Sequence, residues 1–238
     1  AEQQGWLELR SAAEDHEQFL ARPDLGRRLD AASLEAVRSR CERGPDVQIV
    51  VGDGLSATAV EQNAPPMVAA LVGDLAGLGL RPGTVVFVRH CRARLVDVIG
   101  QEVGARVGII LVGERPGLGT GDGMSAYLVW EPSLERTDAE KQAISNIHRR
   151  GLPPEEAGHH AARLVEAIVQ QRTSGVALDV SAIPAPEAAD RARVNQVHPE
   201  PAAGCGQSHG QQCEQAGVGL PGSVCQRTDD RPCQVSTH

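Results

Sequence analysis

Apolar residues gather in short uninterrupted runs, and longer stretches with helical spacing lie between them. The most apolar run covers 107–112 and ends at a charged, glycine-rich turn that begins with Gly113 and Glu114. A run without polar alternation is typical of a strand buried on both faces, as in the inner strands of a parallel sheet. Ligands of open α/β sheets bind beyond the carboxyl ends of such strands. The pattern therefore predicts a ligand site at Glu114; a plain strand followed by a loop is the simpler alternative.

Other strand-like runs lie on both sides of this one. We expect strands at 47–51, 84–88, 107–112, 126–130 and 175–179, with a weaker one at 6–9. Helices are expected at 14–20, 31–40, 56–63, 65–75, 96–103 and 155–172. Strand and helix alternate through the first half of the chain, which favours crossover connections and a parallel sheet. The predicted fold class is α/β, with a Rossmann-like, open, mainly parallel sheet flanked by helices.

Three positions carry signals for the start of a helix. Asp30 and Ser56 can accept hydrogen bonds from the free N–H groups of a first helical turn. Pro65 and Pro66 are expected to begin a separate helix, because proline fits the first turn. Ser56 also lies in a Gly-Leu-Ser-Ala-Thr sequence, which lacks the second glycine of a hydrolase nucleophile elbow. Capping is therefore the preferred role of Ser56.

The composition changes near residue 181. From there onward glycine, proline, glutamine, alanine and serine predominate and aromatic residues are missing from the sequence. Such a segment cannot bury enough apolar surface to offset the entropy of ordering it. We therefore divide the chain into an N-terminal helical, subunit-contact segment (1–45), an α/β domain (46–180) and a low-complexity C-terminal tail (181–238) that is expected to be disordered.

Charge and hydropathy exclude some partners. The chain carries 31 acidic and 23 basic residues, a formal charge of -8, and only 2% aromatic residues. This balance argues against nucleic acid, which needs a basic surface and rings for stacking. No apolar run approaches the ~20 residues that cross a bilayer, and no basic-then-apolar leader opens the sequence. We therefore expect no membrane association and a cytoplasmic location.

Cysteine and histidine spacing disfavours a metal site. Two cysteines, Cys41 and Cys91, lie in the first two segments, and four lie in the tail: Cys205, Cys213, Cys225 and Cys233. The tail contains no C-x-x-C pair, and zinc knuckles need ligands two to four residues apart. Adjacent His159 and His160 would point in different directions on a helix. We predict no metal ligands and reduced thiols. Cys91 could form a thiolate beside several arginines, but a plain buried cysteine is preferred.

Two further motifs carry no complete chemistry. The glycines of 117–123 fail both the dinucleotide spacing and the P-loop pattern, and Lys141 is the only lysine in the chain. Arg22, Arg27 and Arg28 form either a solvated basic face or a contact for an anion or partner. We identify no catalytic residues. Such a chain either binds a cofactor that performs the chemistry or completes a site with another subunit.

Taken together, five ordered motifs resemble the small (light) subunit family of ethanolamine ammonia-lyase. They are Arg22-Pro-Asp-Leu-Gly-Arg-Arg-Leu29, Asp53-Gly-Leu-Ser56, Leu111-Val-Gly-Glu-Arg-Pro-Gly-Leu-Gly119, Ile144-Ser-Asn-Ile-His148 and Ser174-Gly-Val-Ala-Leu178. The resemblance implies a subunit of an adenosylcobalamin-dependent lyase that converts ethanolamine to acetaldehyde and ammonia. It also implies a large TIM-barrel subunit as partner in a hetero-oligomer, and it leaves packaging in a bacterial microcompartment open.

The resemblance also implies three cobalamin-binding positions. Glu114 matches the family glutamate, and Ala93 aligns with a small or branched apolar residue after the second strand. Ala143 stands where the family has a cysteine before Ile-Ser-Asn-Ile, so a contact through that thiol is lost while a backbone contact would remain. The alternative function is a stand-alone, non-catalytic nucleotide- or metabolite-binding α/β module.

Overall fold

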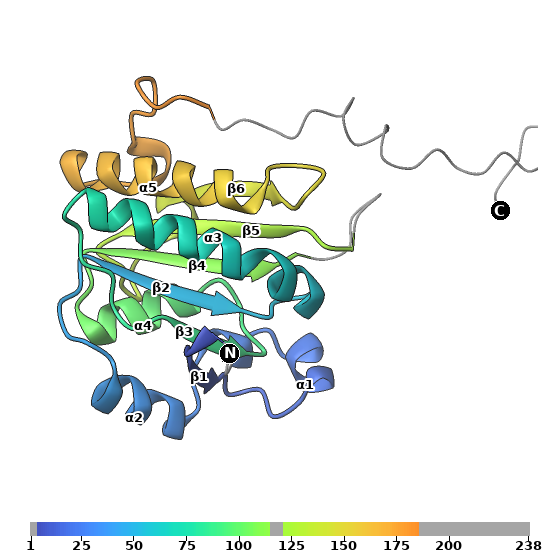
Figure 1. The fold of residues 1–238 in the computed structure, drawn as a ribbon. Helices are drawn as coiled ribbons and strands as arrows, with labels where there is room; N and C mark the ends of the chain where they lie inside the picture. The colour runs from blue at the N-terminus through green and yellow to red at the C-terminus, as the bar shows by residue number, and fades with distance from the viewer. Residues whose placement is uncertain (1–3, 115–120, 186–238) are drawn as a thin grey trace, which may run out of the picture. The chain divides into compact units, whose positions relative to one another are not determined.

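A six-stranded mixed sheet organises the residues that this computed structural model describes, 4–114 and 121–185 (Figure 1). The strands are β1 (Leu7–Arg10), β2 (Val47–Gly52), β3 (Val86–Arg89), β4 (Val107–Gly113), β5 (Met124–Trp130) and β6 (Lys141–Ile147). Their order across the sheet is β1-β3-β2-β4-β5-β6. The first four strands in this order pair in parallel, whereas β5 and β6 join them antiparallel. The α/β prediction is confirmed.

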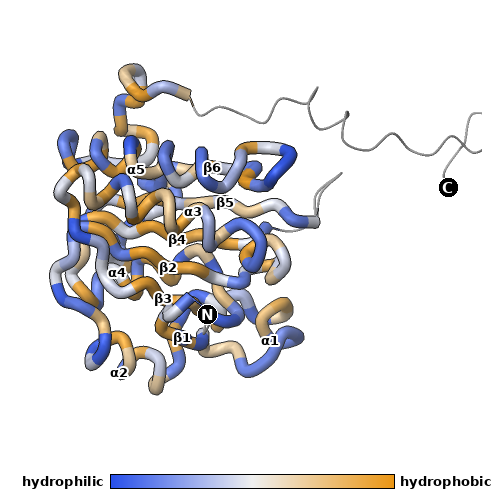
Figure 2. The backbone as a smooth tube through the Cα atoms, in the orientation of Figure 1, coloured by the Kyte–Doolittle hydropathy of each residue, from blue (hydrophilic) through white to orange (hydrophobic). Residues whose placement is uncertain are grey.

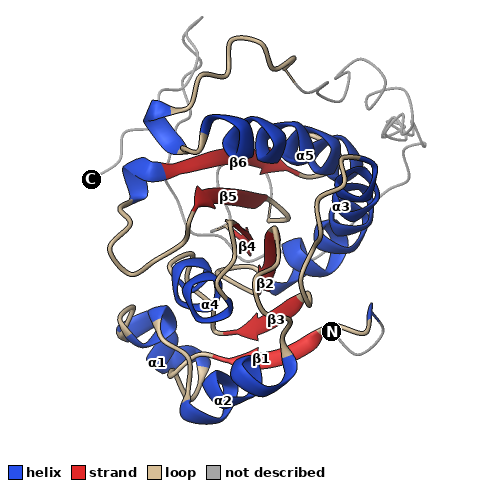
Figure 3. Cartoon of the chain, turned by 90° about the vertical axis from the view of Figure 1, so that its left-hand side faces the viewer, coloured by secondary structure: helices blue, strands red, loops and turns tan. Residues whose placement is uncertain are grey.

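Helices cover the two faces of the sheet (Figure 3). They are α1 (His16–Ala21), α2 (Ala31–Arg40), α3 (Ala57–Gly77), α4 (Leu95–Val103) and α5 (Pro154–Gln171). Helices α3 and α5 pack on one face, and α4 packs on the other, beside α2. The tube coloured by hydropathy shows the central strands β2 and β4 as hydrophobic throughout most of their length (Figure 2).

The central strands are buried on both faces, as the unbroken apolar run predicts. Every residue of β2 and of β4 is buried. Ile109 and Leu111 pack in the core under α3 and α5, whereas Ile110 and Val112 pack in the core under α4. Alternate side chains of one strand therefore join the two helical layers.

Local signals at helix ends are also confirmed. Asp30 Oδ1 accepts a hydrogen bond from the Ser33 N–H at 2.6 Å, and Ser56 Oγ accepts one from the Ala59 N–H at 3.2 Å. Gly104 ends α4 in the left-handed conformation, with φ 72°. Asp30 and Ser56 satisfy N–H groups of a first helical turn, and the Gly104 N–H donates to carbonyl groups of the last turn of α4.

One helix boundary was predicted wrongly. Pro65 and Pro66 do not begin a new helix but lie inside α3, which is continuous over 21 residues. Proline inside a helix costs about 3 kcal/mol because it removes a hydrogen bond and crowds the preceding turn. Here Ala64 before the prolines and Met67 after them are buried in the same hydrophobic core. Burial on both sides of the prolines holds the helix together.

The last predicted strand, 175–179, is also wrong. Residues Gly175–Ala177 form a short 3-10 helix, and Gly175 has φ +68°. The strand that was missed is β6, in which burial recurs at every third residue, at Lys141, Ile144 and Ile147. Ile144 and Ile147 pack in the core under α3 and α5, and a register shift against β5 between them accounts for their spacing. Lys141 lies on the other face, where it pairs with Asp97, so the pattern does not resemble the alternation expected of a strand.

Residues of the proposed N-terminal segment (1–45) belong to the same sheet as the proposed α/β domain, whereas most of the proposed tail lies outside the described residues. Residues 7–10 form edge strand β1, which pairs with β3 in the same sheet as the rest. The short helix expected at 14–20 is observed as α1. The expectation of a disordered tail concerns mainly residues 186–238, which lie outside the described residues.

Two leucines of the α3 segment allow a matched test of the core. Leu71 is fully buried, whereas Leu78 just beyond the last turn is 40% exposed. We expect Leu71→Ala to lower the free energy of unfolding by about 2–5 kcal/mol because it opens a cavity. Leu78→Ala should change it by less than about 0.5 kcal/mol. Urea unfolding followed by circular dichroism measures both; equal effects would contradict this packing.

Candidate functional site

A hollow of about 160 Å³ opens at the carboxyl edge of the sheet, where β2, β3 and β4 end. Glu114 and Ala93, two of the three positions expected to bind cofactor, both line it. The remaining lining residues come from the turns after β2 and β3, from the end of β4 and from β5: Gly54, Leu55, Cys91, Arg92, Val112, Gly113 and Tyr127. The strand-end position predicted from the apolar run therefore borders an open surface.

Asp53 fixes the turn that carries Ala93. Its two carboxylate oxygens accept hydrogen bonds from the backbone N–H groups of His90 and Cys91, at 2.8 and 3.0 Å. His90 has a positive φ of 55°, which non-glycine residues rarely adopt. A carboxylate that accepts two backbone bonds stabilises this conformation. The turn after β2 thus positions the turn after β3.

The turn after β2 and the last residue of β4 touch backbone to backbone at two glycines. The Leu55 N–H donates to the Gly113 carbonyl at 2.9 Å. A Cβ atom on Gly54 would lie 2.3 Å from the Gly113 oxygen, and one on Gly113 would lie 2.1 Å from the Ser56 oxygen. Gly54 also has φ +57°. Only glycine permits this approach.

The same turn holds the chain where it returns to β5. The Ser56 hydroxyl donates to the Gly121 carbonyl at 2.9 Å, and the Asn63 side-chain amide donates to the Asp122 carbonyl at 2.8 Å. The intervening residues 115–120, which include most of the glycine-rich turn, lie outside the described residues. The Asp-Gly-Leu-Ser motif therefore organises three segments around the hollow.

Glu114 is oriented by a residue that the sequence did not single out. The Tyr127 hydroxyl donates to Glu114 Oε1 at 3.0 Å. Burial raises the pKa of Tyr127, and the negative charge of Glu114 acts in the same direction. The hydroxyl therefore stays protonated and donates. Tyr127 is the only tyrosine in the chain and lies on a predicted strand, which was the available signal.

Ala143 lies one strand further from the hollow. It is exposed on β6, and its Cα pairs with that of Tyr127 across the sheet. Directly paired residues share a face, so Ala143 lies on the same face as Tyr127. It is not among the lining residues of the hollow. The structure therefore brings Glu114 and Ala93 together and places Ala143 beside them.

A buried ion pair ties this outer strand to α4. The Nζ atom of Lys141, at the start of β6, lies 3.0 Å from Asp97 Oδ2, and both side chains are almost fully buried. Burial raises the pKa of Asp97, whereas Lys141 and Arg94 beside it act in the opposite direction. The pair connects the strand of Ala143 to the helix that follows Ala93.

The interpretation of Cys91 as a plain buried cysteine is confirmed. Its side chain is 1% exposed. Burial raises the pKa of the Cys91 thiol well above its ordinary value, and Asp53 adds to this effect while Arg92 opposes it. The thiol is therefore protonated and unsuited to nucleophilic chemistry.

The basic cluster at 22–28 lies at the surface. Arg22 and Arg28 both pair with Asp24, at 2.9 and 3.4 Å, and all three side chains are at least half exposed. Exposed pairs of this kind contribute little to stability. Within residues 4–114 and 121–185, no group of three or more His, Cys, Asp or Glu residues could hold a metal ion. The tail cysteines lie outside the described residues.

None of the helices in the described part of the chain has the length and hydrophobicity needed to cross a membrane. The fold and the hollow define an α/β protein with an open hollow at the carboxyl edge of a mixed sheet. The chain belongs to the family described as Ethanolamine ammonia-lyase light chain (EutC), whose model matches residues 1–179. The predicted resemblance is therefore confirmed, and the chain is of the lyase-subunit class.

One relative is the Ethanolamine ammonia-lyase small subunit of Clostridium acetobutylicum. It is 39% identical over 175 residues, which cover 74% of this chain and 72% of the relative. The family match over residues 1–179 includes all six strands of the described sheet and helices α1 to α5. The similarity therefore extends well beyond a single motif.

Gly54 and Gly79 both have a positive φ, so alanine substitutions at these two positions distinguish the cost of steric contact from the cost of backbone strain. Gly54→Ala and Gly79→Ala both place a side chain at positive φ, but nothing lies within 4 Å of a Cβ on Gly79. Gly79→Ala should lower the free energy of unfolding by about 1–2 kcal/mol. Gly54→Ala should cost at least about 1 kcal/mol more, because the turn must separate from the end of β4. Equal losses in urea unfolding would show that this contact tolerates separation.

Burial of Cys91 predicts slow alkylation. The pKa of its thiol is raised, so at pH 8 the folded chain should react with iodoacetamide at Cys91 at least about tenfold more slowly than the urea-unfolded chain. Because the unfolded thiol ionises first, this residue favours unfolding as pH rises above about 8. Peptide mass spectrometry reads Cys91 separately from the other cysteines. Rapid labelling in the native protein would contradict its burial.

Proposed function

We propose that the chain is the small subunit of an adenosylcobalamin-dependent ethanolamine ammonia-lyase, which converts ethanolamine to acetaldehyde and ammonia. Family membership supports this proposal, and so does the name of the relative, an ethanolamine ammonia-lyase small subunit. The observation that carries the cofactor assignment is the placement of Glu114 and Ala93 around one hollow at the carboxyl edge. The partner is the large subunit, in a hetero-oligomer.

The residues at the hollow fit one side of a large planar cofactor with amide side chains. A carboxylate accepts hydrogen bonds from amide N–H groups, and Tyr127 orients the carboxylate of Glu114. Gly54 and Gly113 keep the adjoining turns free of side chains, so a flat ligand can approach the backbone. The hollow measures about 160 Å³. Pockets that enclose a drug-sized ligand measure about 300–1,000 Å³, so a second subunit must cover the opposite face of cobalamin.

The role of this chain is binding and orientation. Adenosylcobalamin, when bound, supplies radical chemistry through its cobalt–carbon bond. Glu114 would hold the cofactor's amide groups, and the small side chains of Ala93 and Ala143 would allow close contact and exclude water. Ala143 provides no thiol, but β6 is a sheet edge whose backbone groups can still bind a ligand. We assign no catalytic residue to this chain.

The place of the protein in the cell follows from the same proposal. Ethanolamine degradation by this lyase would take place in the cytoplasm, and packaging in a bacterial microcompartment is the finer form of this proposal. Fractionation of cells grown on ethanolamine tests both forms, because a packaged subunit sediments with the shell and a free one stays in the supernatant.

Glu114→Ala is the direct test of the cofactor site. The full chain is mixed with an ethanolamine ammonia-lyase large subunit, and adenosylcobalamin affinity is measured by equilibrium dialysis beside acetaldehyde formation. A hydrogen bond to a charged group contributes about 1.5–3 kcal/mol, so Glu114→Ala should weaken cofactor binding by about tenfold or more. Tyr127→Phe, which removes only the orienting hydroxyl, should have a smaller effect.

Glu35→Ala serves as a control, because Glu35 is exposed on α2 away from the hollow. Unchanged cofactor affinity in Glu114→Ala would refute the cofactor site. An inactive mixture, with a large subunit that works with a standard small subunit, would refute the enzyme proposal for this chain. Calorimetry of the chain alone with nicotinamide and adenine nucleotides tests the alternative of a stand-alone binding module.

A further inference from the structure

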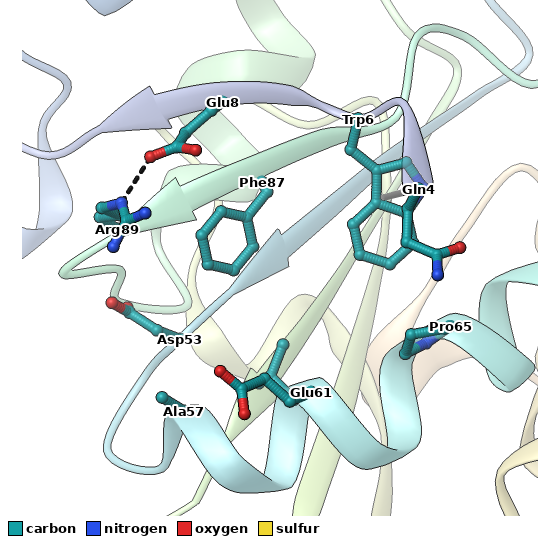
Figure 4. Close-up of a pocket in the computed structure, with 10 residues that line it drawn as sticks. Gln4, Trp6, Glu8, Asp53, Ala57, Glu61, Pro65, Phe87 and Arg89 are labelled. Carbon is teal, nitrogen blue, oxygen red and sulfur yellow. Dashed lines mark hydrogen bonds and ion pairs between the residues drawn. The ribbon is translucent and has the colours of Figure 1, made fainter. Parts of the chain in front are cut away.

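A second, larger hollow lies beside α3 (Figure 4), on the face of the sheet opposite to the one on which Tyr127 packs. It has a volume of about 630 Å³. We call it the β1–β3 groove, and its lining residues are Gln4, Trp6, Glu8, Asp53, Ala57, Val60, Glu61, Pro65, Phe87 and Arg89. Asp53, which shapes the turn of Ala93, also lines this groove, but none of the lining residues of the hollow at Glu114 does.

The groove lies beside the helical layer of its face. Helix α3 packs on β2, β4 and β5, and α5 packs on β4, β5 and β6. The first turns of α3 form one wall, and strands β1 and β3 form the floor (Figure 4). Trp6 and Phe87 face this space and are only partly buried. The sheet therefore presents aromatic surface where its helical cover ends.

Trp6 and Phe87 make up a large share of the few aromatic residues in the chain. It contains two tryptophans, one tyrosine and two phenylalanines, and one tryptophan and one phenylalanine line the groove. Aromatic faces attract ammonium and guanidinium groups and are enriched at protein interfaces. The floor of the groove thus suits a cationic side chain.

Negative charge predominates around this floor. Glu8, Asp53 and Glu61 line the groove against one guanidinium, that of Arg89. Arg89 pairs with Glu8 and lowers the pKa of that carboxyl group, and Asp53 accepts two backbone hydrogen bonds. Glu61 is exposed on α3, and its carboxylate rises from the helix toward the strands (Figure 4). Glu61 is therefore placed to receive a cation.

We propose that the β1–β3 groove binds a basic segment of the large subunit, with an arginine or lysine side chain against Trp6 and Phe87 and paired with Glu61. This inference rests on the proposed function, which supplies the partner. A volume of about 630 Å³ far exceeds a free ethanolamine cation and suits several residues of a chain. A second copy of this chain is a poor occupant, because its net charge of -8 repels an acidic groove.

Charge reversal at Glu61 tests the groove with a matched control. Glu61→Arg is compared with Glu135→Arg; both residues are exposed, and Glu135 lies in the loop between β5 and β6, outside the lining of the groove. Affinity of the full chain for the large subunit is measured by biolayer interferometry at low and high salt. Glu61→Arg should weaken binding about tenfold or more and flatten its salt dependence, and Glu61→Gln should weaken it about threefold. Glu135→Arg should stay within about twofold of wild type.

Phe87→Leu provides a second measurement that does not depend on charge. It removes the ring with little change in volume and should weaken binding about threefold. Circular dichroism and thermal unfolding confirm that each variant is folded. Wild-type affinity in both Glu61→Arg and Phe87→Leu, with ethanolamine turnover intact in the wild-type complex, would overturn the groove proposal alone.

The same variants also test two other possible occupants of the groove. Loss of self-association in Glu61→Arg, seen by light scattering of the chain alone with large-subunit affinity unchanged, would assign the groove to a second copy and refute the proposal. The wild-type chain could also bind free ethanolamine. If Glu61→Arg abolishes that binding and leaves large-subunit affinity unchanged, the groove binds the free amine and the proposal is refuted. A wild-type chain that neither binds nor activates the large subunit would refute the proposed function and this inference with it.

Discussion

The contact between the turn after β2 and the end of β4 is the constraint on which the rest of the site depends. Gly54 and Gly113 let two backbones meet at a distance that any side chain would prevent. Strands β2 and β4 are parallel neighbours, so their carboxyl ends lie side by side. Asp53 and Ser56 then extend this contact to the turn after β3 and to the chain entering β5. The edge of the sheet becomes a rigid rim instead of a set of independent loops.

This rim suits the role proposed for the chain, which is to bind and orient a cofactor. A cofactor that carries the reactive chemistry needs a surface of fixed shape and few, well-placed acceptors. Glu114, oriented by Tyr127, is such an acceptor. The Lys141–Asp97 pair holds the outer strand β6 against α4, so the strand of Ala143 is connected to the helix that follows Ala93. Breaking one partner of a buried pair is costly, which makes this connection hard to lose without loosening the fold.

The two faces of the sheet divide these roles. The hollow at Glu114 lies on the face that α4 covers, and the β1–β3 groove lies on the face that α3 covers. Asp53 stands at the junction, because it lines the groove and also accepts the hydrogen bonds that shape the hollow. A partner bound in the groove would therefore lie against the residue that positions Ala93. Assembly and cofactor binding would then share one structural element.

Local patterns in the sequence were enough for much of this protein. The apolar runs identified β2 and β4, the polar residues Asp30 and Ser56 marked helix starts, and Glu114 was found by its place at the end of a buried strand. These features depend on neighbours along the chain or on burial of a whole strand. The family motifs added Ala93 and Ala143, which no periodicity singles out.

Only the tertiary structure decided the rest. The continuity of α3 through Pro65, the existence of β6 and the bond between Tyr127 and Glu114 each depend on contacts between distant segments. The β1–β3 groove exists because the edge of the sheet extends beyond α3, and no local signal reports where a helix ceases to cover a sheet. Sequence patterns record what each residue must bury. Which buried elements contact one another is decided only when the chain packs.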